Sequence, residues 1–315
     1  AKVMYKEMSI EELSEKFVNN LVETNRGFNF YVDWNNVMDY KQFEIELNAL
    51  NVLIKCENIH DKFVELVKKV PTVVATFPLL FALSKVERKN VWKGKNELKV
   101  VNEDLKENDF YSYNFDIQLI KNNISDENIE IYYTFFEKIG LKDLFQNLLE
   151  KSVIDYVIGV LVGLDSNGRK NRGGKAFELA CEPIIAEICK NHNVQLISQK
   201  QFKVLSKLGF NISEDVANRK ADFILVKNNK VLNIEVDYFY RGGSKPEEII
   251  DSYINRQNDL KKIGIGFALL TDGLCWDNKD KNQLQKGFRN LDYLLNYHLA
   301  KSGMLDEIIS EYFKM

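Results

Sequence analysis

The sequence predicts an α/β protein, with a mixed β-sheet flanked by helices in its second half and a mostly helical N-terminal region before it. Two apolar runs, DFILV at residues 222–226 and VLNIEVDYFY at residues 231–240, are rich in β-branched and aromatic residues, as strands are. The tetrapeptide KNNK between them is typical of a hairpin turn. Helical periodicity appears before and after this hairpin, at residues 174–192 and 245–264. Helices that alternate with strands in this way favour a layered α/β fold.

Composition and charge are those of an ordinary globular protein. The 315 residues are 45% hydrophobic and 28% charged, with a formal net charge of −3, which suffices for a large core in one domain or two. We expect no membrane segment, because no apolar run has a membrane-spanning length and the first residues lack the apolar stretch of a signal peptide. The four cysteines have no CxxC spacing, which indicates free thiols in a reducing cytoplasm rather than a zinc site.

The first half of the chain is expected to be mostly helical. Ser9 and Glu12 have the spacing of a capping box at the start of an amphipathic segment. Helical periodicity then covers most of residues 41–83 and 128–163. We therefore assign residues 1–150 to an N-terminal region that would serve DNA binding or dimerisation.

The second half, residues 151–315, is expected to hold the sheet. GLDSNGRKNRGGK at residues 163–175 has neither a helical nor a strand period and is expected to be a loop. After it the order is helix, strand, the hairpin of two strands, helix and strand, which is αβββαβ. VQLIS at residues 194–198 and IGFALLTDG at residues 265–273 are the outer strands in this order. Two closing helices are expected at residues 282–303 and 304–315.

Three carboxylates stand in and around the predicted hairpin. Asp222 opens the first strand, while Glu235 and Asp237 alternate with apolar residues in the second and therefore share one face. Asp222 can meet that face across the strand pair. Converging carboxylates repel one another and lose hydration, so they persist where a cation such as Mg²⁺ compensates them. The alternative is a hairpin with one solvated face, and the pattern D…ExD is loose enough to leave both interpretations open.

A basic stretch precedes the helix that leads to the sheet. Residues 167–175 contain no acid and are rich in glycine and asparagine. Their cations are Arg169, Lys170, Arg172 and Lys175. The helix that follows carries Glu178, so the stretch lies close in sequence to a further acid. The alternative interpretation is a solvated connector.

The arrangement resembles the PD-(D/E)xK nuclease core, in which one acid opens a strand while a second acid and a third residue lie on the next. The blocks VGLDSNGRKNRGGKAFE, KADF, NIEVDYFYRGGSK and NFYVDW are similar to those of the DpnII/MboI family of type II restriction endonucleases. The resemblance covers most of the chain, and GLDSNGRKNRGG is its specific part. It implies a restriction-endonuclease-like α/β core at residues 151–315, with a basic recognition loop and C-terminal helices.

The resemblance implies a Mg²⁺-dependent enzyme that cuts double-stranded DNA at GATC-like palindromes and leaves 5′ overhangs. Asp222 and Glu235 fall on the first and second carboxylates of the nuclease motif. Glu178 falls where many such cores carry a helix acid that faces the metal. These three residues are the implied metal ligands, and with Asp237 they are the implied catalytic residues.

The third position of the motif normally bears lysine, and here it is Asp237. This departure puts the usual water-orienting amine in doubt. Lys220 or Lys245 would bring an amine back from elsewhere, or Asp237 would itself bind metal or polarise the water.

The resemblance also gives the basic stretch a role at DNA. Arginine contacts guanine in a bidentate way, asparagine does the same at adenine, and lysine suits phosphates. The residues expected to contact DNA are Asn167, Arg169, Lys170, Asn171, Arg172, Lys175 and Lys245.

A palindromic target favours a homodimer, and a restriction enzyme implies a cognate adenine methyltransferase as its genetic partner. Two other hypotheses stay open. One is another nuclease on the same core, such as a repair or nicking enzyme. The other is a DNA-binding protein with a decayed active site, which the missing lysine motivates. Metal-dependent cleavage separates the second from the enzymes.

Overall fold

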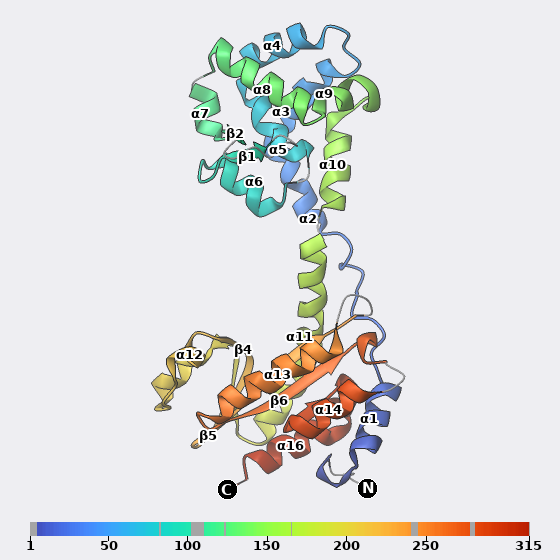
Figure 1. Cartoon of the computed structure of the whole chain (residues 1–315), viewed down its shortest axis with the longest axis vertical. Helices are drawn as coiled ribbons and strands as arrows, with labels where there is room; N and C mark the ends of the chain where they lie inside the picture. The colour runs from blue at the N-terminus through green and yellow to red at the C-terminus, as the bar shows by residue number, and fades with distance from the viewer. Residues whose placement is uncertain are drawn as a thin grey trace. The chain divides into compact units, whose positions relative to one another are not determined.

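A computed structural model describes residues 5–81, 83–101, 110–122, 124–164, 166–240, 245–277 and 281–314 (Figure 1). The chain divides into two compact units. The sheet unit consists of Ala1–Phe30 and Lys170–Met315, and the helical unit consists of Tyr31–Arg169. The chain therefore leaves the sheet unit once, after Phe30, and returns to it once, at Lys170, whereas the predicted organisation has one boundary, between residues 150 and 151.

The sheet unit is built on one mixed sheet, as predicted, but the sheet has five strands rather than the four expected. Its order is β3-β4-β5-β6-β7, with β3, β4 and β5 antiparallel and β5, β6 and β7 parallel. The strands are β3 (Gln195–Gln201), β4 (Lys220–Lys227), β5 (Lys230–Tyr238), β6 (Ile265–Asp272) and β7 (Tyr293–Leu295). Lys227 pairs with Lys230, so the predicted turn is a two-residue hairpin loop. Asn228 in that loop has φ 55°, as the favoured hairpin turns require.

Helices cover both faces of this sheet (Figure 1). On one face the ring of Tyr253, from α13 (Pro246–Lys261), lies 6.0 Å from that of Phe267. On the other, Phe177 of α11 (Ser166–Asn191) lies 5.6 Å from Tyr238. The remaining helical elements of this unit are η1 (Tyr5–Glu7), α1 (Ile10–Asn19), η6 (Phe202–Leu208), α12 (Glu214–Ala217), η7 (Leu274–Trp276), α14 (Asn282–Asn290), α15 (Tyr297–Leu299), η8 (Ala300–Met304) and α16 (Leu305–Tyr312).

The start of the chain is part of the sheet unit's core. Ser9 caps α1, because its Oγ accepts a hydrogen bond from the Glu12 amide at 3.1 Å, in line with the predicted capping-box spacing. Phe17 of this helix is fully buried, with its ring 6.4 Å from Trp276 and 5.9 Å from Phe288. Helix α1 therefore packs against two aromatic residues that are far from it along the sequence.

Asp272, the last residue of β6, joins the segment after α1 to the sheet by hydrogen bonds. Its carboxylate is completely buried. Oδ1 accepts from the amides of Val22 at 2.7 Å and Gly273 at 2.9 Å, and Oδ2 accepts from the amide of Tyr297 at 3.0 Å. Burial raises the pKa of Asp272, and these amides act against that shift.

The prediction of a loop at residues 163–175 was wrong, because the backbone is helical from Ser166 onward and α11 continues through Pro183 to Asn191. The recognition element expected as a basic loop is thus the first part of a long helix. The error has a physical cause. Glycine and asparagine have low helix propensity, and tertiary contacts of Arg169 and Arg172, described below, override that preference here.

The prediction of one helix over residues 282–303 was also wrong. Helix α14 ends at Asn290, and Tyr293–Leu295 forms β7, which pairs in parallel with Ala268, Leu269 and Leu270 of β6. An apolar run of three residues is too short to show a period. These residues form a strand because they pair with the edge of β6.

The helical unit is mostly helical, as predicted, around a core of stacked and tilted aromatic rings. Phe77 lies 6.2 Å from Phe63 and 5.8 Å from Phe136, and Phe136 lies 5.5 Å from Phe145. Its elements are α2 (Trp34–Val37), η2 (Met38–Phe43), α3 (Glu44–Ala49), η3 (Leu50–Leu53), α4 (Ile59–Lys69), η4 (Pro71–Thr76), α5 (Phe77–Leu80), α6 (Lys85–Trp92), β1 (Leu98–Val101), β2 (Phe110–Tyr113), α7 (Ile117–Asn122), α8 (Asp126–Lys138), α9 (Leu141–Asp143), η5 (Leu144–Leu148) and α10 (Val153–Gly163). Among the described residues of both units, no helix is long and apolar enough to cross a membrane.

Candidate active site

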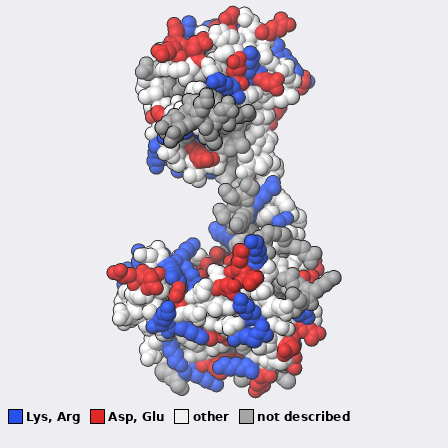
Figure 2. All heavy atoms as spheres, viewed as in Figure 1, with Lys and Arg blue, Asp and Glu red and all other residues white. Residues whose placement is uncertain are grey.

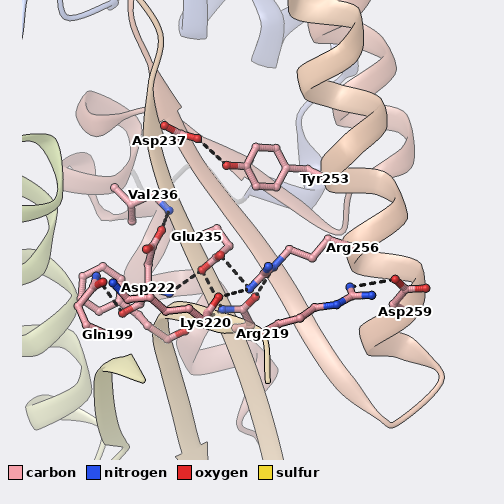
Figure 3. A network of polar contacts seen from close by, with 12 residues as sticks. Gln199, Arg219, Lys220, Asp222, Glu235, Val236, Asp237, Tyr253, Arg256 and Asp259 are labelled. Carbon is pink, nitrogen blue, oxygen red and sulfur yellow. Dashed lines mark hydrogen bonds and ion pairs between the residues drawn. The ribbon is translucent and has the colours of Figure 1, made fainter. Parts of the chain in front are cut away.

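The predicted carboxylates meet where β4 and β5 part. Ladder pairing between these strands runs from Lys227 and Lys230 to Phe223 and Ile234 and then stops. The next residues along the two strands are Asp222 and Glu235, and each carboxylate accepts a backbone amide of the opposite strand instead (Figure 3). The Asp222 amide donates to Glu235 Oε2 at 2.8 Å, and the Val236 amide donates to Asp222 Oδ2 at 3.0 Å.

Glu235 is buried and is held on both of its oxygens. Oε2 also accepts from Asn233 Nδ2 at 3.2 Å, while Oε1 forms an ion pair with Arg256 Nη2 at 2.8 Å. The side chains of Glu235 and Arg256 are only 9% and 18% exposed, so this ion pair is largely shielded from water. The guanidinium belongs to α13 and reaches the carboxylate from one face of the sheet (Figure 3).

Helix α13 also reaches Asp237. The Tyr253 hydroxyl donates to Asp237 Oδ2 at 2.7 Å (Figure 3). Tyr253 and Arg256 are three residues apart and therefore lie on the same side of their helix. Burial, and then the nearby charge of Asp237, raise the pKa of Tyr253, so the hydroxyl keeps its proton and acts as a donor.

Glu178 approaches Asp222 from α11, through Gln199 of β3. Gln199 Nε2 donates to Glu178 Oε2 at 3.3 Å and contacts the Asp222 carbonyl at 3.5 Å. Gln199 has φ 55°, a left-handed conformation inside a strand that costs about 1–3 kcal/mol for a residue other than glycine. The fold thus retains a strained backbone at the residue that joins two of the predicted site acids.

The electrostatics of the site are those of crowded carboxylates. Burial raises the pKa of Glu235 to about 7; the charge of Asp222 acts in the same direction, and Arg256 acts against both. Burial also raises the pKa of Glu178, again with Asp222 adding to the shift. Burial and the repulsion between the carboxylates therefore both oppose ionisation of Glu235 and Glu178.

These side chains suit a hard divalent cation by their chemistry. Each of these acids offers carboxylate oxygens as ligands: Asp222, Glu235 and Glu178. A divalent ion bound among them would relieve the repulsion between their charges. Among the residues that the structure describes, no three His, Cys, Asp or Glu side chains are close enough to coordinate an ion as they stand. Binding would therefore require these side chains to rearrange.

The two predicted DNA-contacting arginines donate to backbone carbonyls of the segment that carries NFYVDW. Arg169 Nε donates to Tyr31 O at 2.9 Å within the helical unit. Arg172 donates to Phe30 O through Nε at 2.9 Å and through Nη2 at 2.6 Å within the sheet unit. Their role at DNA stays a prediction. Asp33, in the same segment, caps α2 by accepting from the Asn35 amide at 3.1 Å.

The other predicted DNA contacts have different surroundings. Lys175 is exposed, and Lys245 is exposed in an ion pair with Glu248 at 3.0 Å. Figure 2 shows Lys and Arg side chains over the visible face of the sheet unit, with acidic side chains among them. The side chains of Asn167, Lys170 and Asn171 lie outside the described part of the chain.

Sequence reasoning missed four residues of this cluster, which are Arg256, Tyr253, Asn233 and Gln199. Asn233 had a signal, because it shares the alternation of Glu235 and Asp237. Arg256 and Tyr253 had only a weak one, namely two polar residues three apart on the helix that follows the hairpin. Gln199 had none, because nothing in the sequence indicates its left-handed backbone.

The sequence of this chain matches known proteins along most of its length. The family model for the DpnII restriction endonuclease matches residues 14–307. The chain is 36% identical over 308 residues to the type II restriction enzyme MjaIII of Methanocaldococcus jannaschii, which covers 94% of this chain and 99% of the relative. It is 32% identical to DpnII of Streptococcus pneumoniae, over 93% of this chain and 97% of that one, and 26% identical to MboI of Moraxella bovis, over 94% and 96%.

Solved structures are much less similar. Can2 from Sulfobacillus thermosulfidooxidans is 11% identical with a TM-score of 0.35, covering 88% of this chain and 90% of its own. Protein VC1899 from Vibrio cholerae is 10% identical with a TM-score of 0.31, covering 85% and 61%. Likeness at this level does not assign a fold.

Proposed function

This chain belongs to the DpnII restriction endonuclease family, and on that basis we propose that it is a type II restriction endonuclease that hydrolyses double-stranded DNA at GATC-like palindromes, with Mg²⁺, to leave 5′ overhangs. The observation that carries the proposal is the meeting of Asp222 and Glu235 where β4 and β5 part, with Glu178 and Asp237 beside them. Four acids from three elements are the material that metal-dependent phosphodiester hydrolysis needs.

The same observations support a PD-(D/E)xK core. Helix α11, the three antiparallel strands β3, β4 and β5, helix α13 and the parallel strand β6 follow the predicted αβββαβ order. The first acid lies near the start of β4, and the second lies near the end of β5. In this proposal Asp222, Glu235 and Glu178 hold the cation, which when bound would neutralise charge on the phosphate and make a water more acidic.

Asp237 occupies the place where the wider superfamily has lysine. With Oδ2 bound to the Tyr253 hydroxyl, its carboxylate has a fixed orientation at the end of β5. We propose that Asp237 accepts a hydrogen bond from the attacking water and so orients it. Tyr253 would then be a positioning residue, since it contacts Asp237 and not the substrate.

The DNA contacts that we propose lie at the start of α11 and beyond it. Arg169, Arg172 and their neighbours in residues 167–175 would contact the target, with Lys245 at a phosphate. A palindrome is matched most simply by two copies related by a two-fold axis, so we propose a homodimer on DNA. A cognate adenine methyltransferase would protect the host's own sites.

Digestion of a mapped plasmid with Mg²⁺, followed by sequencing of the ends, tests the activity. We expect cuts at GATC with 5′ overhangs and no cutting in a chelator. Cuts at one strand only, or at sites without a shared sequence, would instead indicate a nicking or repair nuclease. DNA binding without any metal-dependent cutting would indicate a decayed enzyme and refute the proposal.

A further inference from the structure

Arg256 forms an ion pair with the carboxylate of Glu235, which is one of the proposed metal ligands. Its Nη2 is 2.8 Å from Glu235 Oε1 and 3.0 Å from the Lys220 carbonyl oxygen, and its Nε is 3.3 Å from Asn233 Oδ1. Its guanidinium carbon is 5.4 Å from the centre of the Phe202 ring. The guanidinium is therefore a specific and largely buried part of the site.

The two carboxylate oxygens of Glu235 have different partners. Oε2 accepts from two uncharged donors, the Asp222 amide and Asn233 Nδ2, which belong to the strands themselves. Oε1 faces the guanidinium. A cation bound through Glu235 without disturbing the strand contacts would use Oε1, and two cations on one carboxylate oxygen repel each other strongly.

We propose that Arg256 is a displaceable counter-ion of the candidate metal site. Its guanidinium occupies Glu235 Oε1 while the site holds no metal, and it leaves that oxygen when a divalent cation binds there. This inference rests on the proposed function, because it requires that Glu235 be a metal ligand.

Two features favour exchange over a permanent ion pair. First, the other two bonds of Arg256 go to uncharged oxygens, the Lys220 carbonyl and the Asn233 amide, so the guanidinium keeps hydrogen-bond partners after it leaves Glu235. Second, Asp237 adds a further acid near the other carboxylates, which increases the negative charge that must be balanced before any metal arrives. A cation from α13 lets these carboxylates fold together without metal.

The test is a calorimetric titration of the full-length protein with Ca²⁺, which supports binding without turnover, at pH 8.5. We expect Arg256→Gln to bind Ca²⁺ about tenfold more tightly than the wild type, because the competing charge is gone. If Arg256 serves only to hold Glu235 in place, the same substitution weakens Ca²⁺ binding. Equal or weaker binding by Arg256→Gln therefore overturns the inference.

Arg219→Gln is the matched control. Arg219 is a nearby arginine whose Nη1 pairs with Asp259 at 3.0 Å and whose Nε donates to the Asp215 carbonyl, so its removal is expected to leave Ca²⁺ affinity unchanged. A second control is the double variant Arg256→Gln, Glu235→Gln, in which the gain is expected to disappear. A gain that persists without Glu235 would show that the effect is not exchange at that carboxylate.

A measurement on the wild type avoids dependence on how the variant folds. The Nε–Hε signal of Arg256 in an NMR spectrum, assigned by its absence from Arg256→Lys, is expected to shift when Ca²⁺ saturates the site. An unmoved signal with Ca²⁺ bound overturns the exchange. A wild type that binds no Ca²⁺ and cuts no DNA refutes the proposed function itself, which is a different result from binding and cutting with an unmoved Arg256.

Discussion

The Asp222 amide donates to Glu235 Oε2 at 2.8 Å, so the carboxylate of one strand replaces the ladder bond that the other strand lacks there. The Asp222 carboxylate acts in the same way on the neighbouring residue, because its Oδ2 accepts from the Val236 amide at 3.0 Å. The two acids are therefore parts of the strand pairing as well as candidate ligands. Substitutions at this pair affect stability and cleavage together, and the two effects have to be measured separately.

Replacing Asp222 with alanine is expected to abolish cleavage and to lower the free energy of unfolding by about 1–3 kcal/mol, because the Val236 amide loses its acceptor in a partly buried place. Asp222→Asn keeps an acceptor oxygen and should abolish cleavage with a smaller loss of stability. Plasmid digestion and chemical denaturation measure the two effects. DNA binding in Ca²⁺ should survive in both variants, and full cleavage by Asp222→Ala would contradict the assignment.

Metal binding is expected to weaken in acid because of Glu235. Burial raises the pKa of this carboxyl to about 7, so below that pH a cation must displace a proton, and above it the carboxylate is already ionised. Ca²⁺ affinity should therefore be constant above about pH 8 and fall roughly tenfold per pH unit below about pH 7. Calorimetry across this pH range tests whether Ca²⁺ affinity falls in acid. An affinity that stays constant down to pH 5.5 would exclude Glu235 as the group that controls metal binding.

Alanine at Arg169 or Arg172 distinguishes contact with bases from contact with phosphates. If either arginine contacts a base, the loss should fall on cognate DNA and amount to about 1–3 kcal/mol per bidentate contact. If both contact phosphates, all DNA should lose affinity alike and with a smaller salt dependence. We expect the cognate-specific loss for at least one of the two.

The measurement is a pair of titrations with each variant, on cognate and scrambled duplexes at two salt concentrations with Ca²⁺. Arg172 also donates to the Phe30 carbonyl, so the thermal stability of the Arg172→Ala variant must be compared with that of the wild type. The uncharged variant Asn171→Ala is tested alongside. Equal losses on both duplexes for all three variants would place base recognition elsewhere.

The assembled enzyme is expected to carry two copies per cognate duplex, each cutting one strand of the palindrome. Sedimentation of the protein with a duplex that holds one GATC site, in Ca²⁺, gives the ratio directly. A complex of one copy per duplex that still cuts both strands would refute the two-fold arrangement.

Asp272→Ala is expected to lower the free energy of unfolding by about 3 kcal/mol or more, because three backbone amides lose a charged and buried acceptor. Asp272→Asn, which retains one acceptor oxygen, should lose less. Denaturation of both variants at neutral pH measures the difference. Equal stability of the alanine variant and the wild type would show that water replaces the carboxylate.

The hairpin and its acids were predictable because their information is local. Alternation over residues 231–240 placed Glu235 and Asp237 on one face, and KNNK fixed the turn. The contact of Asp222 with Glu235 follows from that register alone. The capping-box spacing of Ser9 and Glu12 was equally local, and Ser9 does cap α1.

Other parts of the site depend on distant partners and were not predictable in this way. Arg256 reaches Glu235 only because α13 packs back over the sheet at one rotation about its axis, and periodicity does not specify that rotation. The helical start of α11 has poor intrinsic propensity, and Phe30, which Arg172 contacts there, is 142 residues away along the chain. Strand β7 exists because β6 offers an edge. In each case tertiary packing overrides the local preference.

Because Ala1–Phe30 belongs to the sheet unit, the order of synthesis on the ribosome matters for this protein. Helix α1 emerges long before its partners Trp276 and Phe288 are made. Val22 and Asp272 are 250 residues apart, which at 5–20 residues per second is a wait of roughly 10–50 s. During that interval the apolar side of α1 has no core to join, whereas the helical unit, contiguous in sequence, can fold as it emerges. The sheet would therefore close only after Asp272 and the helices that follow it have been made, which delays the appearance of DNA-cutting activity in a growing cell until then.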